Sequence, residues 1–302
     1  MDTTLTNPKS QTPPAVGGST TSAPAPEHPL LKGTATLLEG APGSGKTYSI
    51  PTLIEAGLEV FVLVTEPGGE ESLLDSMRDR NLSLDKLHYH YIAPAAPAWS
   101  DLQDMAKKIN TMNYEDLTKL KSGVAKRGYG QFYEMLSTLQ NFTCDHCGEE
   151  FGGADTWDAK RALVIDSLSG VNTMAWNMTV GAKPAAHQGE WGVAMNAIEA
   201  FLNKLTGDLR CFLVLTAHVE RELDEVQGGT KIMVSSLGRK LAPKIPRNFS
   251  DVIYSYREGD QYYWSTTTAQ VDLKTRSLPL SDKIEPSFGA IVKAWQTRQA
   301  QT

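Results

Sequence analysis

Residues 40–47, GAPGSGKT, combine glycines, a lysine and a threonine at a spacing that suits phosphate binding. They fit the pattern G-x-x-x-x-G-K-[ST] at every fixed position, between a strand-like and a helix-like segment, as the pattern requires. The glycines let successive backbone N–H groups point at phosphate oxygens at a helix N-terminus. Lys46 would reach the β- and γ-phosphates, and Thr47 would ligate magnesium. The sequence predicts a phosphate-binding loop made of Gly40, Ala41, Pro42, Gly43, Ser44, Gly45, Lys46 and Thr47.

A magnesium ion at such a loop needs a carboxylate from the end of a neighbouring strand. The segment ALVID supplies Asp166 after a run of apolar residues. An apolar strand that ends in Asp is common, but together with the phosphate-binding loop it indicates a magnesium ligand. No guanine-reading N-K-x-D segment occurs, because NKLT at 203–206 lacks the aspartate. The sequence therefore favours ATP and Mg²⁺ as the cofactors.

The strands that must position these residues follow from the hydrophobic pattern. We expect buried strands at 34–40, 59–66, 86–93, 162–170 and 211–218. The stretch 251–268 indicates a hairpin that turns at Glu258, Gly259 and Asp260. Because strands and helices alternate, the sequence predicts an α/β fold with a mostly parallel sheet flanked by helices and a C-terminal antiparallel hairpin.

Three stretches have the pattern of helices. Residues 46–57 would form a helix closed by Gly57, provided that Pro51 lies in its first turns. Residues 100–141 are expected to be helical, and the amphipathic spacing of residues 198–205 predicts a helix that ends at Gly207.

The composition is that of an ordinary globular chain, with 302 residues, 40% of them hydrophobic and 21% charged. Few large apolar side chains occur in the proline-rich residues 1–30, so we expect a disordered tail, then a core over 31–295 and a flexible end at 296–302. No apolar run approaches the roughly 20 residues of a membrane span. With three cysteines and no secretory signal, a cytoplasmic protein without a membrane partner is expected.

Three further segments resemble, in their order and type, the RecA-like ATPases, including the DnaB-type helicases. VFVLVTE ends in Glu66, FLVLTAH ends in His218, and VDLKTRS carries Lys274 and Arg276. The resemblance covers residues 33 to about 293 and is strongest to the minimal RecA-like ATPases that bacteriophages use in single-strand annealing and recombination. It implies a RecA-like P-loop NTPase fold, and the host cytoplasm if a phage encodes the protein.

The resemblance also implies roles near the γ-phosphate. Glu66 would be the general base that orients the attacking water, with Glu70 and Glu71 as rivals in the same turn. His218 stands where the family usually has a glutamine that senses the γ-phosphate and relays its presence to a DNA-binding loop. The alternatives are a surface glutamate and a histidine that is hydrogen-bonded locally at a strand end.

Lys274 and Arg276 match a K-x-R pair that related proteins carry on a late strand. There the pair reaches into the ATP site of the neighbouring subunit, where an arginine offsets charge in the transition state. This implies a homo-oligomer, as a ring or a filament, with ATP at its interfaces. The alternative is a solvated basic strand edge.

Single-stranded DNA is the expected partner, bound by two loops, 170–192 and 221–247. Stacking aromatics and cations are present in them: Trp176, Lys183, His187 and Trp191 in the first, and Lys231, Arg239, Lys240, Lys244 and Arg247 in the second. Because the net charge is −6, such a site would have to be local. The alternative is that both loops pack subunits together.

The segment FTCDHCGEEFGG resembles half of a zinc ribbon, within an insertion at 142–158. Cys144 and Cys147 would be zinc ligands, but zinc usually takes four and no second C-x-x-C exists. His88 and His90 could complete the site. The alternative is a ribbon-like hairpin without metal.

Taken together, the sequence predicts an ATPase that hydrolyses ATP at subunit interfaces and is stimulated by single-stranded DNA, in phage-type recombination, annealing or replication. A ring helicase motor or a helicase loader is one alternative. A nucleotide-switched assembly protein without nucleic acid is another, and the acidic balance of charges favours it.

Overall fold

The computed structural model describes residues 33–93, 98–119, 129–181, 188–223, 228–238 and 240–301. The chain divides into Met1–Leu30 and Leu31–Thr302, and the tail expected at 1–30 lies outside the described residues. Lys183, His187 and Arg239 of the predicted DNA-binding segments lie outside them too. Within the described ranges, no helix combines the length and the apolar character that crossing a membrane requires.

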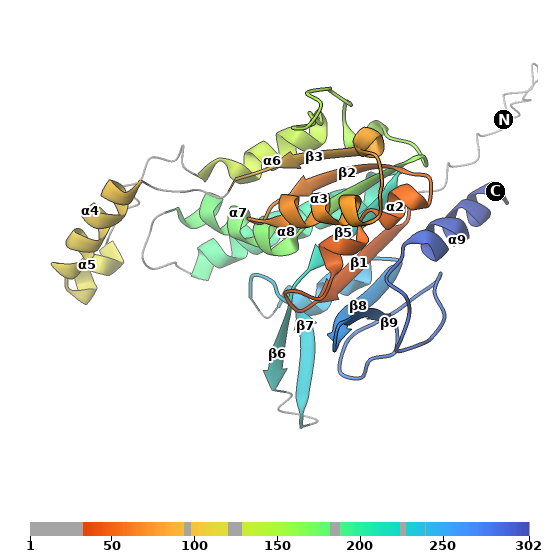
Figure 1. Cartoon of the computed structure of the whole chain (residues 1–302). Helices are drawn as coiled ribbons and strands as arrows, with labels where there is room; N and C mark the ends of the chain where they lie inside the picture. Colours follow the sequence, from red (N-terminus) through yellow and green to blue (C-terminus); the bar gives the residue numbers. More distant parts are fainter. Residues whose placement is uncertain are drawn as a thin grey trace, which may run out of the picture. The chain divides into compact units, whose positions relative to one another are not determined.

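A seven-stranded sheet in the order β3-β2-β4-β5-β1-β8-β9 forms the centre of the fold (Figure 1). Its strands are β1 (Ala35–Gly40), β2 (Glu59–Val64), β3 (Leu87–Tyr91), β4 (Arg161–Asp166), β5 (Phe212–Ala217), β8 (Asp251–Glu258) and β9 (Gln261–Ser265). All neighbouring pairs in this sheet are parallel except β8 and β9, which form the expected hairpin. A separate two-stranded sheet pairs β6 (Val219–Leu223) with β7 (Thr230–Val234). The predicted α/β fold is confirmed.

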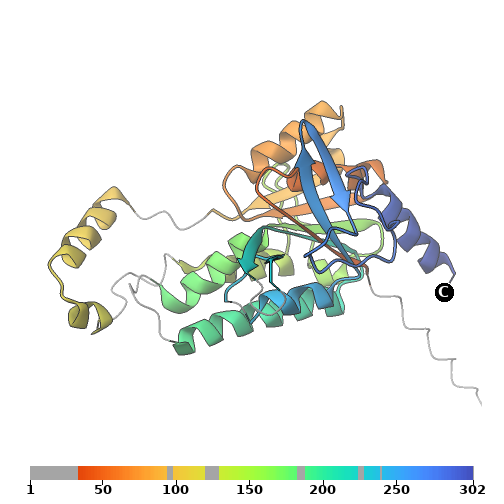
Figure 2. The same cartoon turned by 90° about the horizontal axis from the view of Figure 1, so that it is seen from below.

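Helices cover both faces of the seven-stranded sheet (Figure 2). The helices described are α1 (Lys46–Ser49), α2 (Thr52–Glu55), α3 (Gly69–Asp79), α4 (Trp99–Asn110), α5 (Tyr114–Lys119), α6 (Gln131–Gln140), α7 (Leu168–Val180), α8 (Gln188–Asp208) and α9 (Gly289–Ala300). Neighbouring residues of a strand point to opposite faces, so Leu37 packs with α6, α7 and α8, whereas Leu38 packs with α2, α3 and α9.

Two of the expected helices are divided. The helix predicted at 46–57 is split into α1 and α2, because Pro51 has no N–H to continue the hydrogen bonding of α1 and instead caps α2. The stretch 100–141 contains α4, α5 and α6 rather than one continuous helix. Its apolar face is only partly inside, since Phe132 and Met135 are buried while Leu136 is exposed.

The strand predicted at 162–170 is too long, and the loop predicted at 170–192 is mostly helical in its described residues. β4 ends at Asp166, where the Ser167 side chain accepts a hydrogen bond from Ser169 N and caps α7. Within 170–192, Val171, Met174 and Ala175 are buried at helical spacing in α7, and α8 begins at Gln188. At the C-terminus, α9 continues to Ala300, so the flexible end expected at 296–302 is helical over most of its length.

Candidate functional site

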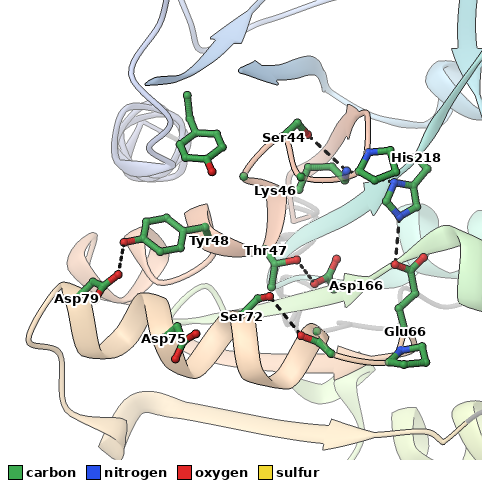
Figure 3. Close-up of a pocket in the computed structure, with 17 residues that line it drawn as sticks. Ser44, Lys46, Thr47, Tyr48, Glu66, Ser72, Asp75, Asp79, Asp166 and His218 are labelled. Atoms are coloured by element: carbon green, nitrogen blue, oxygen red, sulfur yellow. Dashed lines mark hydrogen bonds and ion pairs between the residues drawn. The ribbon is translucent and has the colours of Figure 1, made fainter. Parts of the chain in front are cut away.

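A cavity of about 670 Å³ lies at the carboxyl ends of β1, β2, β4 and β5 (Figure 3). Residues 42–47 of the phosphate-binding loop line it together with Glu66, Asp166 and His218. The order of the strands brings these side chains together. β5 lies between β1 and β4, and His218 directly after it lies between Lys46 of the loop and Glu66. β2 pairs with β4 and places Glu66 beside Asp166.

The loop has the backbone that phosphate binding needs. Gly43 and Gly45 have φ angles of 72° and 85°, in the left-handed region that glycine adopts without strain. A Cβ atom on Gly45 would lie 2.8 Å from a ring carbon of Tyr262, so a side chain there would also collide with β9. The loop is therefore compatible with glycine and poorly compatible with larger residues at this position.

Lys46 lies inside the loop that it belongs to. Its Nζ donates to the carbonyl oxygens of Gly40 at 2.9 Å and Ala41 at 3.0 Å, and it lies 3.4 Å from His218 Nδ1. Burial lowers the pKa of Lys46 to about 8, although Asp166 and Glu66 act in the opposite direction. The ammonium group is thus held by weak neutral partners, which phosphate oxygens would replace.

Thr47 and Asp166 meet as a magnesium site would require. Thr47 Oγ1 donates to Asp166 Oδ2 at 2.7 Å, and the hydroxyl of Thr216 on β5 donates to Asp166 Oδ1. Burial raises the pKa of Asp166, and the two hydroxyl hydrogen bonds oppose that rise. A hydroxyl and a carboxylate oxygen are hard donors of the kind that Mg²⁺ takes beside phosphates, so these residues fit the ion.

Glu66 is joined to the rest of the site by hydrogen bonds. The Ser167 hydroxyl donates to Glu66 Oε1, and His218 Nε2 lies 3.1 Å from Glu66 Oε2. Burial alone would raise the pKa of Glu66, but the bonds from His218 and Ser167 and the positive charge of Lys46 lower it below its ordinary value. The group is therefore an ionised carboxylate at neutral pH, which is the state that a base needs.

The two rivals of Glu66 lie away from the cavity. Among the described residues that line it, neither Glu70 nor Glu71 occurs. Glu70 is hydrogen-bonded to the Tyr89 hydroxyl, and this contact contributes to the raised pKa of that tyrosine. Glu71 is exposed on α3. Geometry thus separates three glutamates that sequence alone could not.

Lys274 and Arg276 do not belong to a strand, so that part of the prediction is wrong. Lys274 forms one isolated bridge with Val252. Arg276 lies in a bend, and its backbone N donates to an oxygen of buried Asp251 at 2.7 Å. Both side chains are exposed. Partial burial and the nearby charge of Arg276 both lower the pKa of Lys274. Neither is among the described residues that line the cavity.

These two cations lie at the other end of the sheet from the phosphate-binding loop. Asp251, which anchors their segment, pairs in register with Thr36 at the start of β1, whereas the loop begins at Gly40. At a rise of about 3.3 Å per residue, this places the anchor about 13 Å from the loop along the sheet.

Within the described residues, the predicted DNA-binding segments contain helices and strands, and two of their cations are ion-paired. Trp176 of α7 and Trp191 of α8 form a tilted ring pair with centroids 4.0 Å apart, and 38% of Trp191 is exposed. Two of the predicted cations have acidic partners from elsewhere in the chain. Lys231 pairs with Asp272 at 2.8 Å, and Lys244 pairs with Glu199 at 3.2 Å.

The cysteine pair lies beside the edge strand β3. Of the two histidines considered as further ligands, His88 lies beside the cysteines, while His90 Nδ1 is 2.8 Å from Asp145 Oδ1. Cys211, the third cysteine, is buried in the core.

Sequence reasoning missed several residues of the cavity. Tyr48 and Tyr262 line it, and the Tyr48 hydroxyl donates to Asp79 Oδ2 at 2.7 Å. Ser167 and Thr216 hold the carboxylates in place. A usable signal existed for three of them: Tyr48 and Ser167 each adjoin a predicted site residue, and Thr216 lies two positions before His218. For Tyr262 no sequence signal existed, because a hairpin brings it over the loop from far along the chain.

Comparison with known families gives one result. A family model described as "AAA domain" matches residues 32–277. No curated protein matches the chain. The matched range contains the phosphate-binding loop, the cavity and the segment that carries Lys274 and Arg276.

Proposed function

The chain belongs to the AAA domain family of P-loop ATPases, and on this premise we propose that it is a RecA-like ATPase that binds single-stranded DNA and hydrolyses ATP between subunits. Its process would be phage-type recombination, annealing or replication. The observation that carries the proposal is the connected group of Lys46, His218 and Glu66 in the cavity, beside the Thr47–Asp166 pair.

Each side chain of this group has a chemical task in hydrolysis. The Glu66 carboxylate would accept the proton of the attacking water, and His218 would orient that carboxylate while facing the γ-phosphate position. Lys46 would neutralise charge on the β- and γ-phosphates. Magnesium on Thr47 and Asp166 would supply charge neutralisation between the same phosphates. The task of Ser167 is to fix the rotamer of Glu66 through its hydroxyl.

The second subunit is proposed because no arginine projects into the cavity among the residues that the structure describes there. None of the described residues that line the cavity is an arginine, while exposed Lys274 and Arg276 lie at the opposite end of the sheet. In a head-to-tail assembly they would reach the neighbouring nucleotide. An arginine in that place contributes about 10³–10⁵ to the rate in related enzymes.

The nucleotide site and the proposed DNA-binding segments share structural contacts. His218 is followed directly by β6, and its carbonyl accepts a hydrogen bond from Ser235 N after β7 at 2.8 Å. Ser235 O in turn accepts from Asn172 of α7 at 3.1 Å. Glu66 also lines a second cavity, of about 250 Å³, at the start of α7. A shift of His218 or Glu66 on ATP binding would therefore be transmitted to α7 and the β6–β7 hairpin.

The test measures ATP turnover with and without single-stranded DNA over a series of salt concentrations. We expect stimulation by DNA and binding that weakens steeply with salt. Replacing Trp191 by alanine should lower DNA affinity by about 5–150-fold, since stacking contributes about 1–3 kcal/mol per base. The matched control is Trp99→Ala, which removes a tryptophan that is 83% exposed on α4 and should leave DNA affinity unchanged.

One alternative has specific support. The pairing of Lys231 and Lys244 with acidic residues and the net charge of −6 favour a nucleotide-switched assembly protein that does not bind nucleic acid. No DNA binding at low salt, together with ATP-dependent assembly, would establish that alternative. Strand separation driven by ATP would instead indicate a helicase motor.

A further inference from the structure

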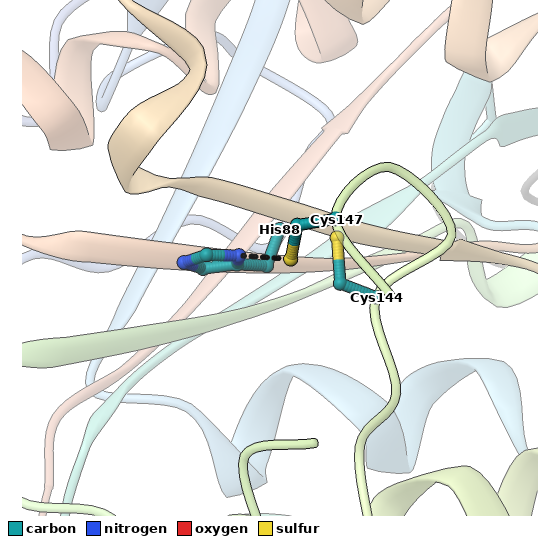
Figure 4. A group of neighbouring side chains, drawn as sticks. All are labelled: His88, Cys144 and Cys147. Atoms are coloured by element: carbon teal, nitrogen blue, oxygen red, sulfur yellow. Dashed lines mark hydrogen bonds between the residues drawn. The ribbon is translucent and has the colours of Figure 1, made fainter. Parts of the chain in front are cut away.

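Three side chains that can ligate a metal ion converge at the outer edge of the sheet (Figure 4). Cys144 and Cys147 come from a hairpin after α6, and His88 comes from β3. Their ligand atoms all lie within 4.8 Å of one another, and Cys147 Sγ is 3.8 Å from His88 Nδ1. Tetrahedral zinc would set this sulfur–nitrogen distance at about 3.6 Å, given Zn–S of about 2.3 Å and Zn–N of about 2.0–2.1 Å.

The hairpin already has the turn that two cysteine ligands require. Cys144 N donates to Glu149 O at 3.0 Å, and Gly148 N donates to Cys144 O at 2.9 Å. Gly148 has a φ of 74°, which lets the chain reverse directly after Cys147. The two sulfur atoms are thereby held on one side of the turn without any rearrangement of the backbone.

His88 is oriented by its surroundings so that Nδ1 faces the sulfur atoms. Its Nε2 lies 3.4 Å from Glu59 Oε1, and Glu59 is ion-paired with Arg161 at 2.7 Å. The imidazole is also stacked on Phe61, with ring centroids 4.8 Å apart. A carboxylate behind a histidine favours a proton on the far nitrogen and leaves the near nitrogen free to bind metal, an arrangement common around zinc.

We propose that Cys144, Cys147 and His88 bind one zinc ion, with water at the fourth position because Cys147 is exposed. The ion would join the hairpin to β3, the edge strand of the sheet. That edge is already covered there, since Asp145 N donates to Tyr89 O at 2.8 Å and Tyr91 N donates to Asp145 Oδ2 at 2.7 Å. Zinc would hold this hairpin against β3, so that β3 could not pair with a strand of another chain.

The experiment measures metal in the full-length chain purified under reducing, anaerobic conditions. Elemental analysis should give about one zinc ion per chain, as expected for a site of this kind. Cobalt added to the metal-free protein should give the visible absorption of tetrahedral Co²⁺ with thiolate ligands. Cys147→Ser and His88→Gln should each lose most of the bound zinc, and Cys147 is exposed, so its replacement should not impair folding.

Two control variants make the result specific. His146→Gln changes the histidine between the two cysteines, and Cys211→Ser changes a cysteine outside the cluster; both should keep their zinc. The proposal is overturned if the reduced protein contains no stoichiometric zinc and shows no cobalt–thiolate absorption. It is equally overturned if His88→Gln binds zinc as tightly as the unaltered chain, since the histidine would then not be a ligand.

Discussion

At the scale of single residues, the cavity shows how different surroundings suit two carboxylates to different roles. Asp166 and Glu66 are both carboxylates near Lys46, yet burial raises the pKa of Asp166 while the pKa of Glu66 is lowered by hydrogen bonds from His218 and Ser167. Asp166 accepts hydrogen bonds from the hydroxyl groups of Thr47 and Thr216, whereas Glu66 faces the imidazole of His218. One is suited to ligate magnesium and the other to act as a base.

Replacing Glu66 by glutamine tests the base. ATP binding should be retained, because Lys46, Thr47 and Asp166 are untouched, and turnover should fall by about 10²–10⁴. Equilibrium binding of labelled ATP and steady-state phosphate release measure the two effects. Glu71→Gln is the matched control and should be fully active, since Glu71 is exposed on α3. Normal turnover by Glu66→Gln would rule out this residue as the base.

Replacing Glu39 by glutamine tests a buried carboxyl group that hydrolysis does not use. Glu39 is 1% exposed, and neither carboxylate oxygen has a hydrogen-bond partner among the described residues. Burial raises its pKa from 4.5 to about 8, with a further contribution from the charge of Asp272. The folded state therefore keeps a proton that the unfolded chain releases, and stability falls as pH rises from about 4.5 to about 8.

Because glutamine cannot ionise, Glu39→Gln should be more stable than the unaltered chain at the upper end of that pH window, by roughly 1–3 kcal/mol. The difference should vanish at the lower end, where both side chains are neutral. Urea unfolding at both ends of the window measures it, with exposed Glu71→Gln as control. Stability curves that fall in parallel for both proteins would show that Glu39 is not the titrating group.

At the scale of elements, the segment that carries Lys274 and Arg276 is held by a buried carboxylate and by the bridge of Lys274 with Val252. Asp251 at the start of β8 accepts hydrogen bonds from Thr275 Oγ1 at 2.8 Å, Arg276 N at 2.7 Å and Ser277 N at 3.2 Å. Together with the two backbone hydrogen bonds between Lys274 and Val252, these contacts fix the backbone, so the two exposed cations leave the sheet from a defined position. A cation that must meet a neighbouring nucleotide needs such a support.

Replacing Asp251 by alanine should therefore impair turnover more than ATP binding. The part-buried donors of residues 275–277 would lose their acceptor, which should also cost roughly 2–4 kcal/mol of stability. Nucleotide affinity, turnover and urea unfolding are measured on the same preparation, below the unfolding transition. Thr275→Ala, which removes one donor and leaves the acceptor, is the milder comparison. Full turnover by a folded Asp251→Ala protein would contradict a positioning role.

At the scale of the whole molecule, the groups proposed for hydrolysis lie at two ends of one sheet. The phosphate-binding loop, Glu66 and His218 are at the carboxyl ends of the parallel strands, and Arg276 is near the opposite end of β8. One chain cannot bring both ends to the same nucleotide, so the proposal requires two copies arranged head to tail.

Mixing two inactive variants tests this requirement. Arg276→Ala and Glu66→Gln should each be nearly inactive, but an equal mixture should recover roughly a quarter of full activity. The reason is that a random assembly places intact Glu66 opposite intact Arg276 at about one interface in four. ATP turnover of the mixture measures the recovery.

The control mixture combines Glu66→Gln with Lys46→Ala. Both changes damage the same half of the site, so no interface of that mixture is complete and no recovery is expected. Mixed assembly is checked by native mass measurement. If mixed assemblies of Arg276→Ala and Glu66→Gln form without any recovery, catalysis across the interface is excluded.

The sequence by itself determined the features that depend on neighbouring residues. The loop at 40–47 was predictable because its glycines, lysine and threonine act within one turn of chain, and the parallel sheet was predictable because buried strands and helices alternate. Asp166 was placed correctly beside Thr47, since a strand that ends in a carboxylate must bring it to the edge where the loop lies. The helices within 170–192 were not predicted, because a glycine and polar residues concealed the helical spacing of the apolar residues.

Only the tertiary structure decided which distant residues meet. It placed Glu66 in the cavity and left Glu70 and Glu71 outside its lining. It also brought His88, and not His90, to the cysteines. Finally, it placed Asp251 where it accepts a hydrogen bond from the backbone of Arg276. The order of strands in the sheet cannot be read from any one segment, because it results from packing the whole core on both faces. Side chains that are far apart along the chain therefore become neighbours only when that packing is complete.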